Sequence, residues 1–308
     1  MIEKIASMAD NKGKLDEHTA EELKVLDTSL AQMRERHFPR IATKDLQAVV
    51  YHYTNDEGLK GILQSSQLWF TSIFNLNDPS ELTRGMQAGQ DLLIGALGHR
   101  GSKIRKFIED RPLDAAYLKS TRFFTCSFST DSDELGQWRS YADDGRGFAI
   151  GFESKNLLQD QNTITYPVKY DDKSFNETAR DLIAIAIPFL LKHEGSGVDV
   201  ARPAVSGYAS LLASLTMAAI LHKHEDYKQE SEVRSIVRAK QGFQYRMRPY
   251  DLVQYVPYHY GDTQIIREIV VGPSQRERSA AFVRDCLSAF YKHKVEIRFS
   301  DIPYRPSR

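Results

Sequence analysis

The sequence has few cysteines, no excess of charge of either sign and no long hydrophobic run. Its only cysteines, Cys126 and Cys286, are isolated from each other. A disulfide framework or a thiolate zinc site is therefore not expected, and a reducing cytoplasm is the expected compartment. The 41 Lys and Arg residues equal the 41 Asp and Glu residues. This balance argues against a generally basic nucleic-acid binder and against an acidic tail, and it leaves room for a local basic groove.

Membrane and export signals are equally sparse. The longest apolar stretch recognised, Leu182–Leu191, contains Pro188 and reaches about half the length of a membrane-spanning helix. The first residues carry too many charges for a secretory signal. With ordinary hydrophobic and charged fractions of 41% and 27%, the chain is expected to be a soluble globular protein with no membrane partner.

What the sequence does contain is a mixture of short strand-like and helix-like segments. Leu23, Leu26, Leu30 and Met33 fall at helical spacing and predict a helix over residues 14–36. Further helices are expected after Asn55 and over 86–120, 135–142, 173–222 and 279–291. Strands rich in β-branched and aromatic residues are expected at 46–54, 68–72, 122–128, 148–152, 164–170, 230–237, 252–258, 265–271 and 294–299.

These segments predict an α+β fold of mixed, mostly antiparallel short strands surrounded by helices. Residues 46–308 are expected to form a single domain with a helical insertion at 173–222, in which the stretch at 193–203 is the best candidate for mobility. Residues 1–45 are expected to form a helical extension. Its helix either packs on the domain or joins two copies of the chain in a homodimer.

Four clusters carry chemistry, and each also has a structural explanation. Tyr51, His52, Tyr53 and Thr54 end a strand just before a capped helix, where polar groups often meet a ligand, although a single strand histidine is more often structural. The second cluster is interpreted as scaffold, because Asp78, Pro79 and Glu81 form a capping box and Asn75 and Asn77 are loop residues.

The third cluster is a short helix and the turn that follows it. Trp138 and Tyr141 are three residues apart and share a helix face, which is typical of a core and also of a surface that stacks on a ring. The turn at 143–147 lacks the GxGxxG and GxxxxGK[ST] patterns of a phosphate loop. The 129–131 segment is expected to cap this helix.

The fourth cluster lies on the strand predicted at 230–237. Alternation places Glu230, Glu232 and Arg234 on one face. A solvated, self-neutralising edge is the favoured interpretation, and a carboxylate site for a hydroxyl or a developing cation is the other. No metal site is expected: His222 and His224 do not converge on a helix, and no HExxH motif is present.

Taken in order, the motifs YHYT, LWFTSIFNLNDPSE, FTCSFS, LGQWRSYADDGRGFAIGF, YKQESEVR, IREIVVGP and FSDIPYR resemble a bacterial family known as domain of unknown function 2971. The resemblance extends from about Tyr51 to Arg305. A more distant similarity links the His-x-Thr, the central aromatic helix and the later Glu to the His-Tyr-Glu arrangement of ADP-ribosyltransferases. That similarity implies sheets of the ADP-ribosyltransferase type, with NAD as the substrate.

The similarity also implies a role for each matching residue. His52, supported by Thr54, would bind the adenosine ribose of NAD, with Tyr53 standing where diphtheria-type enzymes have Gly. Tyr141, or Trp138 in its place, would stack on nicotinamide.

Glu232 would bind the nicotinamide ribose and stabilise its oxocarbenium ion, and Glu230 would orient the acceptor. A fixed carboxylate suits that task because positive charge grows on the ribose as nicotinamide leaves. Tyr51, Tyr53 and Tyr227 also compete for the stacking role.

The resemblance implies an NAD-consuming transferase in toxin or phage-defence biology, modifying a protein or a nucleic acid. Two alternatives stay open: a non-catalytic binding or regulatory module on the same fold, and a hydrolase or nuclease that uses Glu230, Glu232 and His52. Arg122, Arg139, Arg146 and Arg234 are candidates for a basic lining that holds the NAD pyrophosphate or RNA.

Overall fold

The structure is a computed structural model of the chain. It describes residues 15–39, 48–76, 79–110, 122–157, 163–195, 200–239, 241–248, 251–261, 264–274 and 276–305. The chain divides into two compact units, each assembled from three separate segments. A helical unit takes residues 1–39, 76–122 and 169–225, and a sheet unit takes 40–75, 123–168 and 226–308.

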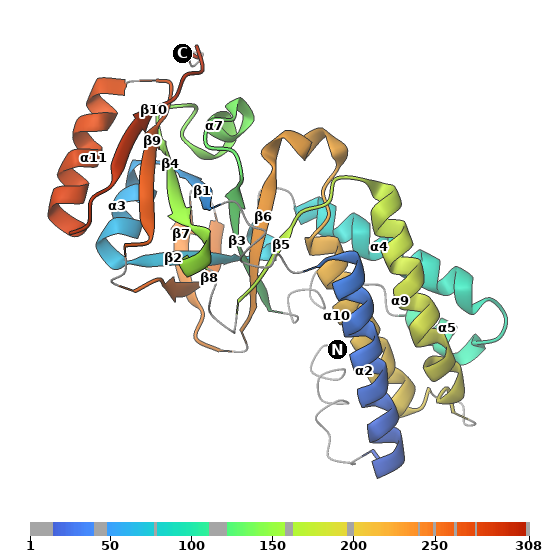
Figure 1. Ribbon diagram of the computed structural model, residues 1–308. Coiled ribbons are helices and arrows are strands. Elements are labelled where there is room, and N and C mark those ends of the chain that lie inside the picture. Colours follow the sequence, from blue (N-terminus) through green and yellow to red (C-terminus); the bar gives the residue numbers. More distant parts are fainter. Residues whose placement is uncertain are drawn as a thin grey trace. The chain divides into compact units, whose positions relative to one another are not determined.

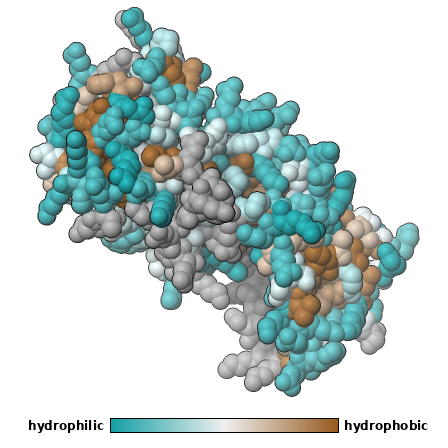
Figure 2. Space-filling view, viewed as in Figure 1, coloured by the Kyte–Doolittle hydropathy of each residue, from teal (hydrophilic) through white to brown (hydrophobic). Residues whose placement is uncertain are grey.

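This division differs from the single domain with appendages that the sequence predicts. The helix expected as an N-terminal extension and the block expected as an insertion belong to one and the same helical unit, together with the helices after residue 78. The surface seen in Figure 2 is mainly hydrophilic, and its hydrophobic side chains lie in separate groups.

The helical unit consists of long helices that pack on one another (Figure 1). They are α2 (Glu17–His37), α4 (Pro79–Leu97), α5 (Ser102–Glu109), α9 (Asp172–Lys192) and α10 (Arg202–Ile220). Leu26 and Leu30 of α2 are buried, which confirms the amphipathic helix predicted there. Because α2 packs on α9 and α10, its apolar face contributes to the core of this unit.

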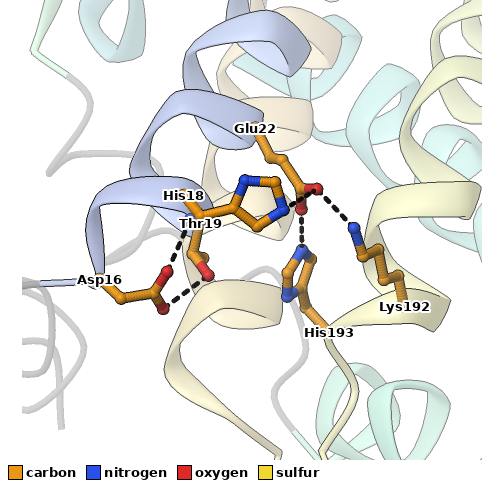
Figure 3. Close-up of polar contacts among 6 residues, drawn as sticks. All are labelled: Asp16, His18, Thr19, Glu22, Lys192 and His193. Atoms are coloured by element: carbon orange, nitrogen blue, oxygen red, sulfur yellow. Dashed lines mark hydrogen bonds and ion pairs between the residues drawn. The ribbon is translucent and has the colours of Figure 1, made fainter.

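Polar contacts near the start of α2 hold it against the end of α9 (Figure 3). The Glu22 carboxylate accepts a hydrogen bond from Lys192 and lies 2.7 Å from His193 Nε2 and 3.2 Å from His18 Nε2. Farther along, His37 Nε2 lies 2.8 Å from an Asp181 oxygen. The two helices are therefore antiparallel and are tied at two separated points.

Helix α10 has the length and apolar composition of a membrane span, and 61% of its most apolar window is buried inside the protein. The sequence analysis named Leu182–Leu191 as the longest apolar stretch and did not identify α10 as a candidate span. A buried core helix passes the same test of length and composition.

The sheet unit contains ten described strands and short helices. The strands are β1 (Val49–Thr54), β2 (Gln67–Ser72), β3 (Phe123–Ser129), β4 (Phe148–Glu153), β5 (Ile164–Pro167), β6 (Glu232–Arg238), β7 (Gln244–Arg248), β8 (Asp251–His259), β9 (Ile266–Val271) and β10 (Glu296–Phe299). The helices of this unit are α3 (Asp56–Ser65), α7 (Leu135–Tyr141), α8 (Ser154–Leu157) and α11 (Arg276–Phe290). The predicted α+β class with a mixed, mostly antiparallel sheet is confirmed.

The strands follow the order β10-β9-β4-β1-β3-β2-β8-β7, and β6 pairs with both β3 and β5. Strand β3 pairs with three other strands and so joins the parts of the sheet. One of its edges pairs with β6 along its whole length, while the other meets β1 at Ser129 and β2 at Phe124 and Thr125. The second edge thus opens between β1 and β2, around Ser127.

Cross-strand partners share a face of a sheet, so the register defines two faces. The core face carries Val50, Ile150 and Phe128 and is covered by α3 and α11 (Figure 1). The opposite face carries Tyr51, Tyr53 and Val270 and packs against α7, and we call it the α7 face.

Most predicted elements of the sheet unit are present, with three differences. The cap of α7 is the Glu134 carboxylate, which accepts from Gln137 N at 2.7 Å, and not the segment 129–131. Strand β7 was not predicted, because QYRMR contains no β-branched residue, although Tyr245 and Met247 alternate with polar side chains. Glu230 lies in a 3-10 helix, Glu225–Glu230, and not in β6. The predicted loop residue Asn77 and the predicted cap Asp78 fall outside the described residues.

Candidate functional site

The α7 face carries a row of aligned residues across several strands. The register joins Glu268 to Gly151, Gly151 to Tyr51, Tyr51 to Ser129 and Ser129 to Glu232. Alternation adds Tyr53, Ser127 and Arg234 to the same face. Tyrosines, hydroxyls and charged groups therefore share one face of the sheet, opposite the hydrophobic core.

Tyr51 is the centre of a buried ionic cluster at one side of this row. Its hydroxyl donates to Glu268 Oε1 at 2.5 Å, and Arg298 donates two hydrogen bonds to the same carboxylate, one of them from Nη2 at 3.0 Å. Burial, together with the Glu268 charge, raises the pKa of Tyr51 to about 12. Burial opposes ionisation of Glu268, but the bonds from Arg298 and Tyr51 outweigh it and hold the pKa of Glu268 below its ordinary value.

Tyr53 and Trp138 form the packed part of the α7 face. Trp138 is 0% exposed, meets the Tyr53 ring edge-on at 4.8 Å and donates from Nε1 to Asp133 Oδ1 at 2.7 Å. The Tyr53 hydroxyl donates to Asp131 O and accepts from Glu134 N. Burial raises the pKa of Tyr53. Both rings thus fix α7 on the sheet, and the structure places Trp138 in the core, where it is not accessible for stacking on a ligand.

Asp133 connects the closing motif, FSDIPYR, to helix α7 of the motif LGQWRSYADDGRGFAIGF. Its carboxylate accepts from the Ser300 hydroxyl at 2.5 Å and from Asp301 N at 2.8 Å, in addition to the Trp138 indole. Tyr304 donates to Asp144 at 2.6 Å in the turn after α7. The last described residues therefore hold α7 and its turn in place.

Glu232 and Arg234 form a bidentate ion pair on β6. Arg234 donates from Nε to Oε1 at 2.7 Å and from Nη2 to Oε2 at 3.0 Å, and both residues are 5% exposed. Strand β6 lies between β3 and β5, so it is not an edge. The shared face of these two residues is confirmed, and the interpretation as a solvated edge is wrong because neighbours on both sides bury the pair.

The Glu230 side chain contacts Tyr141, and hydrogen bonds to the Glu230 backbone carbonyl hold the residue in place. The Tyr141 hydroxyl donates to Glu230 Oε1 at 3.2 Å, and the Glu230 carbonyl accepts from Ser129 Oγ and Gln137 Nε2. Ser231 follows with φ of 45°, in the left-handed region that non-glycine residues rarely adopt. This turn breaks the alternation before β6 begins, which is why Glu230 does not share the strand face of Glu232 as predicted.

His52 belongs to the core face, opposite Tyr51 and Glu232. It pairs with Ile150, its ring lies 5.9 Å from that of Phe128, and its Nδ1 is 3.0 Å from Ser127 O at the opening between β1 and β2. A carbonyl only accepts, so Nδ1 carries the proton and Nε2 offers a lone pair. Burial lowers the pKa of His52, which keeps the ring neutral at pH 7.

The predicted site residues are thus only partly brought together. Tyr141 meets Glu230, and Glu232 meets Arg234, while His52 lies on the other face of the sheet. Thr54 is buried at the end of β1. Arg122 belongs to the helical unit and lies at the far end of β3 from Ser127.

The predicted basic lining is not a single surface in the described part of the chain. Arg234 is bound to Glu232, Arg146 pairs with Asp143 at 3.2 Å, and Arg139 is exposed on α7. A hollow of about 470 Å³ is lined by Pro273, Ile302, Pro303, Tyr304 and Arg305, none of which is a predicted site residue. Among the described residues, no group of three or more His, Cys, Asp or Glu side chains is arranged to hold a metal ion.

Sequence reasoning missed Glu268, Arg298 and Arg246 as partners of the motif residues. Glu268 had a local signal, since it is the one acidic residue inside the apolar strand β9. Arg298 and Arg246 had none, because their partners lie on distant segments.

The fold and this face define an α+β protein with a polar, charge-bearing sheet face that is clamped by a short helix. The family model described as a protein of unknown function, DUF2971, matches residues 137–235, from α7 into β6. The match covers less than half of the chain and includes Tyr141, Glu230, Glu232 and Arg234. None of the curated proteins and none of the solved structures matched the chain.

Proposed function

We propose that the chain is an NAD-dependent ADP-ribosyltransferase-like enzyme whose reaction centre is the Tyr141–Glu230 pair. The contact between the Tyr141 hydroxyl and the buried Glu230 carboxylate, at 3.2 Å, is the observation that carries this proposal. It joins an aromatic ring and a carboxylate, the two groups that glycosidic cleavage of NAD requires. The resemblance of the ordered motifs to ADP-ribosyltransferases supplies this reaction class, with His52 of the implied triad on the other face of the sheet.

The chemistry assigns each group a simple task. The bond between the ribose C1′ and the nicotinamide nitrogen breaks, its electron pair stays on that nitrogen, and nicotinamide leaves as a neutral molecule. The ribose becomes an oxocarbenium ion, which the Glu230 carboxylate stabilises more than it stabilises the ground state. An acceptor oxygen or nitrogen then attacks C1′ and loses its proton to solvent or a base.

Glu230, and not Glu232, is the stronger candidate for the stabilising carboxylate. Arg234 binds both oxygens of Glu232, so the negative charge of Glu232 is already compensated. Glu230 contacts Tyr141, the residue proposed to stack on nicotinamide, through the Tyr141 hydroxyl. Glu232 with Arg234 then acts as a rigid support that holds the turn at Ser231.

Replacement of each carboxylate tests this assignment. Glu230→Gln should lower NAD consumption by at least about a hundredfold, the size of effect expected when one charge-stabilising group is lost. Tyr141→Phe keeps the ring and should retain most of the activity. Nicotinamide release, measured with purified full-length protein and with a panel of protein and nucleic-acid acceptors, is the readout.

Ser140→Ala, an exposed change on the same helix, is the matched control and should leave turnover unchanged. Full activity in Glu230→Gln would show that another group carries the reaction. NAD binding without consumption by the wild type would favour a binding module, and NAD-independent cleavage that needs a divalent metal would favour a hydrolase or nuclease. In a toxin or phage-defence effector, expression of the wild type but not of Glu230→Gln should slow growth.

A further inference from the structure

A second polar group lies on the same face of the sheet, at the other end of β3. Arg246 of β7 reaches across the sheet, and its Nη2 donates to Thr71 Oγ1 at 3.1 Å. The register pairs Thr71 with Thr125 of β3, so the two hydroxyls are neighbours.

An aromatic surface adjoins this cation. The Arg246 guanidinium lies 5.2 Å from the centre of the Trp69 ring, and Trp69 lies 4.5 Å from Tyr255. Trp69 is 40% exposed, although the residues before and after it in β2 are buried. An exposed tryptophan beside an arginine offers both a stacking surface and a positive charge.

Thr125 supplies an independent sign that a ligand belongs here. It is 2% exposed, and within the described part of the chain its hydroxyl has no hydrogen-bond partner. A buried hydroxyl without a partner is costly and rare in native proteins. Thr125 pairs across the strands with Thr71, whose hydroxyl accepts from Arg246. The Thr125 side chain therefore lies beside the Arg246–Thr71 contact.

Hydroxyl side chains connect this group to the Tyr141–Glu230 pair. Thr125, Ser127 and Ser129 alternate along β3 on the α7 face, and Ser129 donates to the Glu230 carbonyl. Four residues of strand separate the two ends by about 13 Å, which is the scale of a dinucleotide and exceeds that of a single nucleotide.

We propose that Arg246, Thr71, Thr125 and Trp69 form a subsite for the phosphate-bearing adenylate end of the dinucleotide, with Arg246 and the hydroxyls on a phosphate and Trp69 on the adenine ring. This subsite rests on the proposed function for its place in the reaction, but its binding can be measured separately. A guanidinium fork suits phosphate oxygens, and a threonine hydroxyl can donate to them.

The two tryptophans of the chain make the subsite directly visible. Trp138 is fully buried and Trp69 is exposed. Titration of the full chain with ADP should therefore quench the exposed, red-shifted part of the emission. Trp69→Phe should remove that signal while calorimetry still detects ADP binding. Quenching that persists in Trp69→Phe would overturn the assignment of the ring.

Two probes separate the phosphate contacts from the stacking contact. Arg246→Gln should weaken both ADP and inorganic pyrophosphate by at least about tenfold, as expected for loss of a charge-assisted hydrogen bond. Trp69→Leu should weaken ADP about fivefold or more and leave pyrophosphate unchanged. Arg284→Gln is the matched control, because it removes one exposed charge from α11 on the core side of the sheet, and both ligands should bind it as they bind the wild type.

Thr125→Val provides a second test, which can be carried out even if Arg246→Gln does not fold. It removes the unpartnered hydroxyl, so it should raise the Tm of the ligand-free protein while weakening ADP binding. A merely structural threonine would not change the two quantities in opposite directions. Unchanged ADP affinity in both Thr125→Val and Arg246→Gln would overturn the subsite.

The outcomes for the subsite and for the reaction are distinct. ADP binding that depends on Arg246, in a protein that consumes no NAD, keeps the subsite and refutes the proposed function. NAD consumption that is insensitive to Arg246→Gln in both KM and kcat keeps the proposed function and refutes the subsite. No ADP binding by the wild type at millimolar concentration also refutes the subsite.

Discussion

Arginines bind the two carboxylates of the α7 face. Arg298 and Tyr51 share the oxygens of Glu268, and Arg234 takes both oxygens of Glu232. Glu230, in the turn before β6, accepts a hydrogen bond from Tyr141. Alternation in the sequence predicts that Glu232 and Arg234 share a face, and this is confirmed. Their burial was beyond prediction, because it depends on β5, which pairs with β6 from a distant part of the chain.

At the residue scale, Tyr51→Phe tests how much the cluster of Tyr51, Glu268 and Arg298 contributes to the free energy of unfolding. The change removes a 2.5 Å hydrogen bond to Glu268 and should lower the free energy of unfolding by about 1.5–3 kcal/mol, the range for bonds to charged groups. Urea denaturation measures the loss. Tyr304→Phe is the control: its hydroxyl also binds an aspartate, but Tyr304 is less buried, so water replaces the bond and the loss should be smaller. Equal losses would contradict the role of burial.

The antiparallel contact of α2 with α9 shows what sequence can say about an element. The spacing of Leu26 and Leu30 predicts the helix and its apolar face, and both residues are buried. The partner of that face is not encoded locally, so the helix was expected to be an extension. Local signals were sufficient for α3, whose predicted Asn55 cap is confirmed by its bond from Gly58 N at 2.9 Å. They were insufficient for β7, whose five residues include no β-branched side chain.

At the element scale, Glu22 should make the joint between α2 and α9 sensitive to acid. Bonds from Lys192 and then His193 lower the pKa of Glu22 from its ordinary 4.5. A lowered pKa in the folded state means that the ionised carboxylate stabilises the fold above pH 4.5 and loses this effect as the pH falls through the folded value. Thermal unfolding should show wild type more stable than Glu22→Gln at pH 7.

The difference between wild type and Glu22→Gln should shrink as the pH falls below about 4.5. Glu21→Gln is a neighbouring control, since Glu21 pairs with the exposed Lys24 at 3.6 Å, and it should show little difference at any pH. A constant difference between wild type and Glu22→Gln down to pH 3 would contradict the assignment.

At the scale of the whole molecule, the chain passes between its two units several times. Each unit collects three segments, so neither corresponds to a continuous stretch that composition could delimit. This is the physical reason why the sequence predicts one domain with appendages. The α+β class was predictable from strand and helix patterns, but the allocation of helices to units depends on long-range packing.

Leu30→Ala tests whether the helical unit opens by itself. Leu30 is 1% exposed, and its truncation should cost about 2–5 kcal/mol. Hydrogen exchange should accelerate in α2, α9 and α10, while β1, β4 and β9 keep their protection. Val25→Ala, on the same helix at 58% exposure, should change neither. Equal acceleration in the sheet unit would show that the two units unfold together.

The hydrogen bonds that Asp133 accepts from distant segments of the chain also have a consequence for synthesis of the protein. The indole of Trp138, the Ser300 hydroxyl and the Asp301 amide meet on one carboxylate, and Arg298 completes the Tyr51 cluster. The α7 face therefore reaches its final form only after the ribosome has made nearly all of the described chain. A nascent or prematurely terminated chain would lack this face, so any activity that depends on the α7 face would begin only after these last segments have been made.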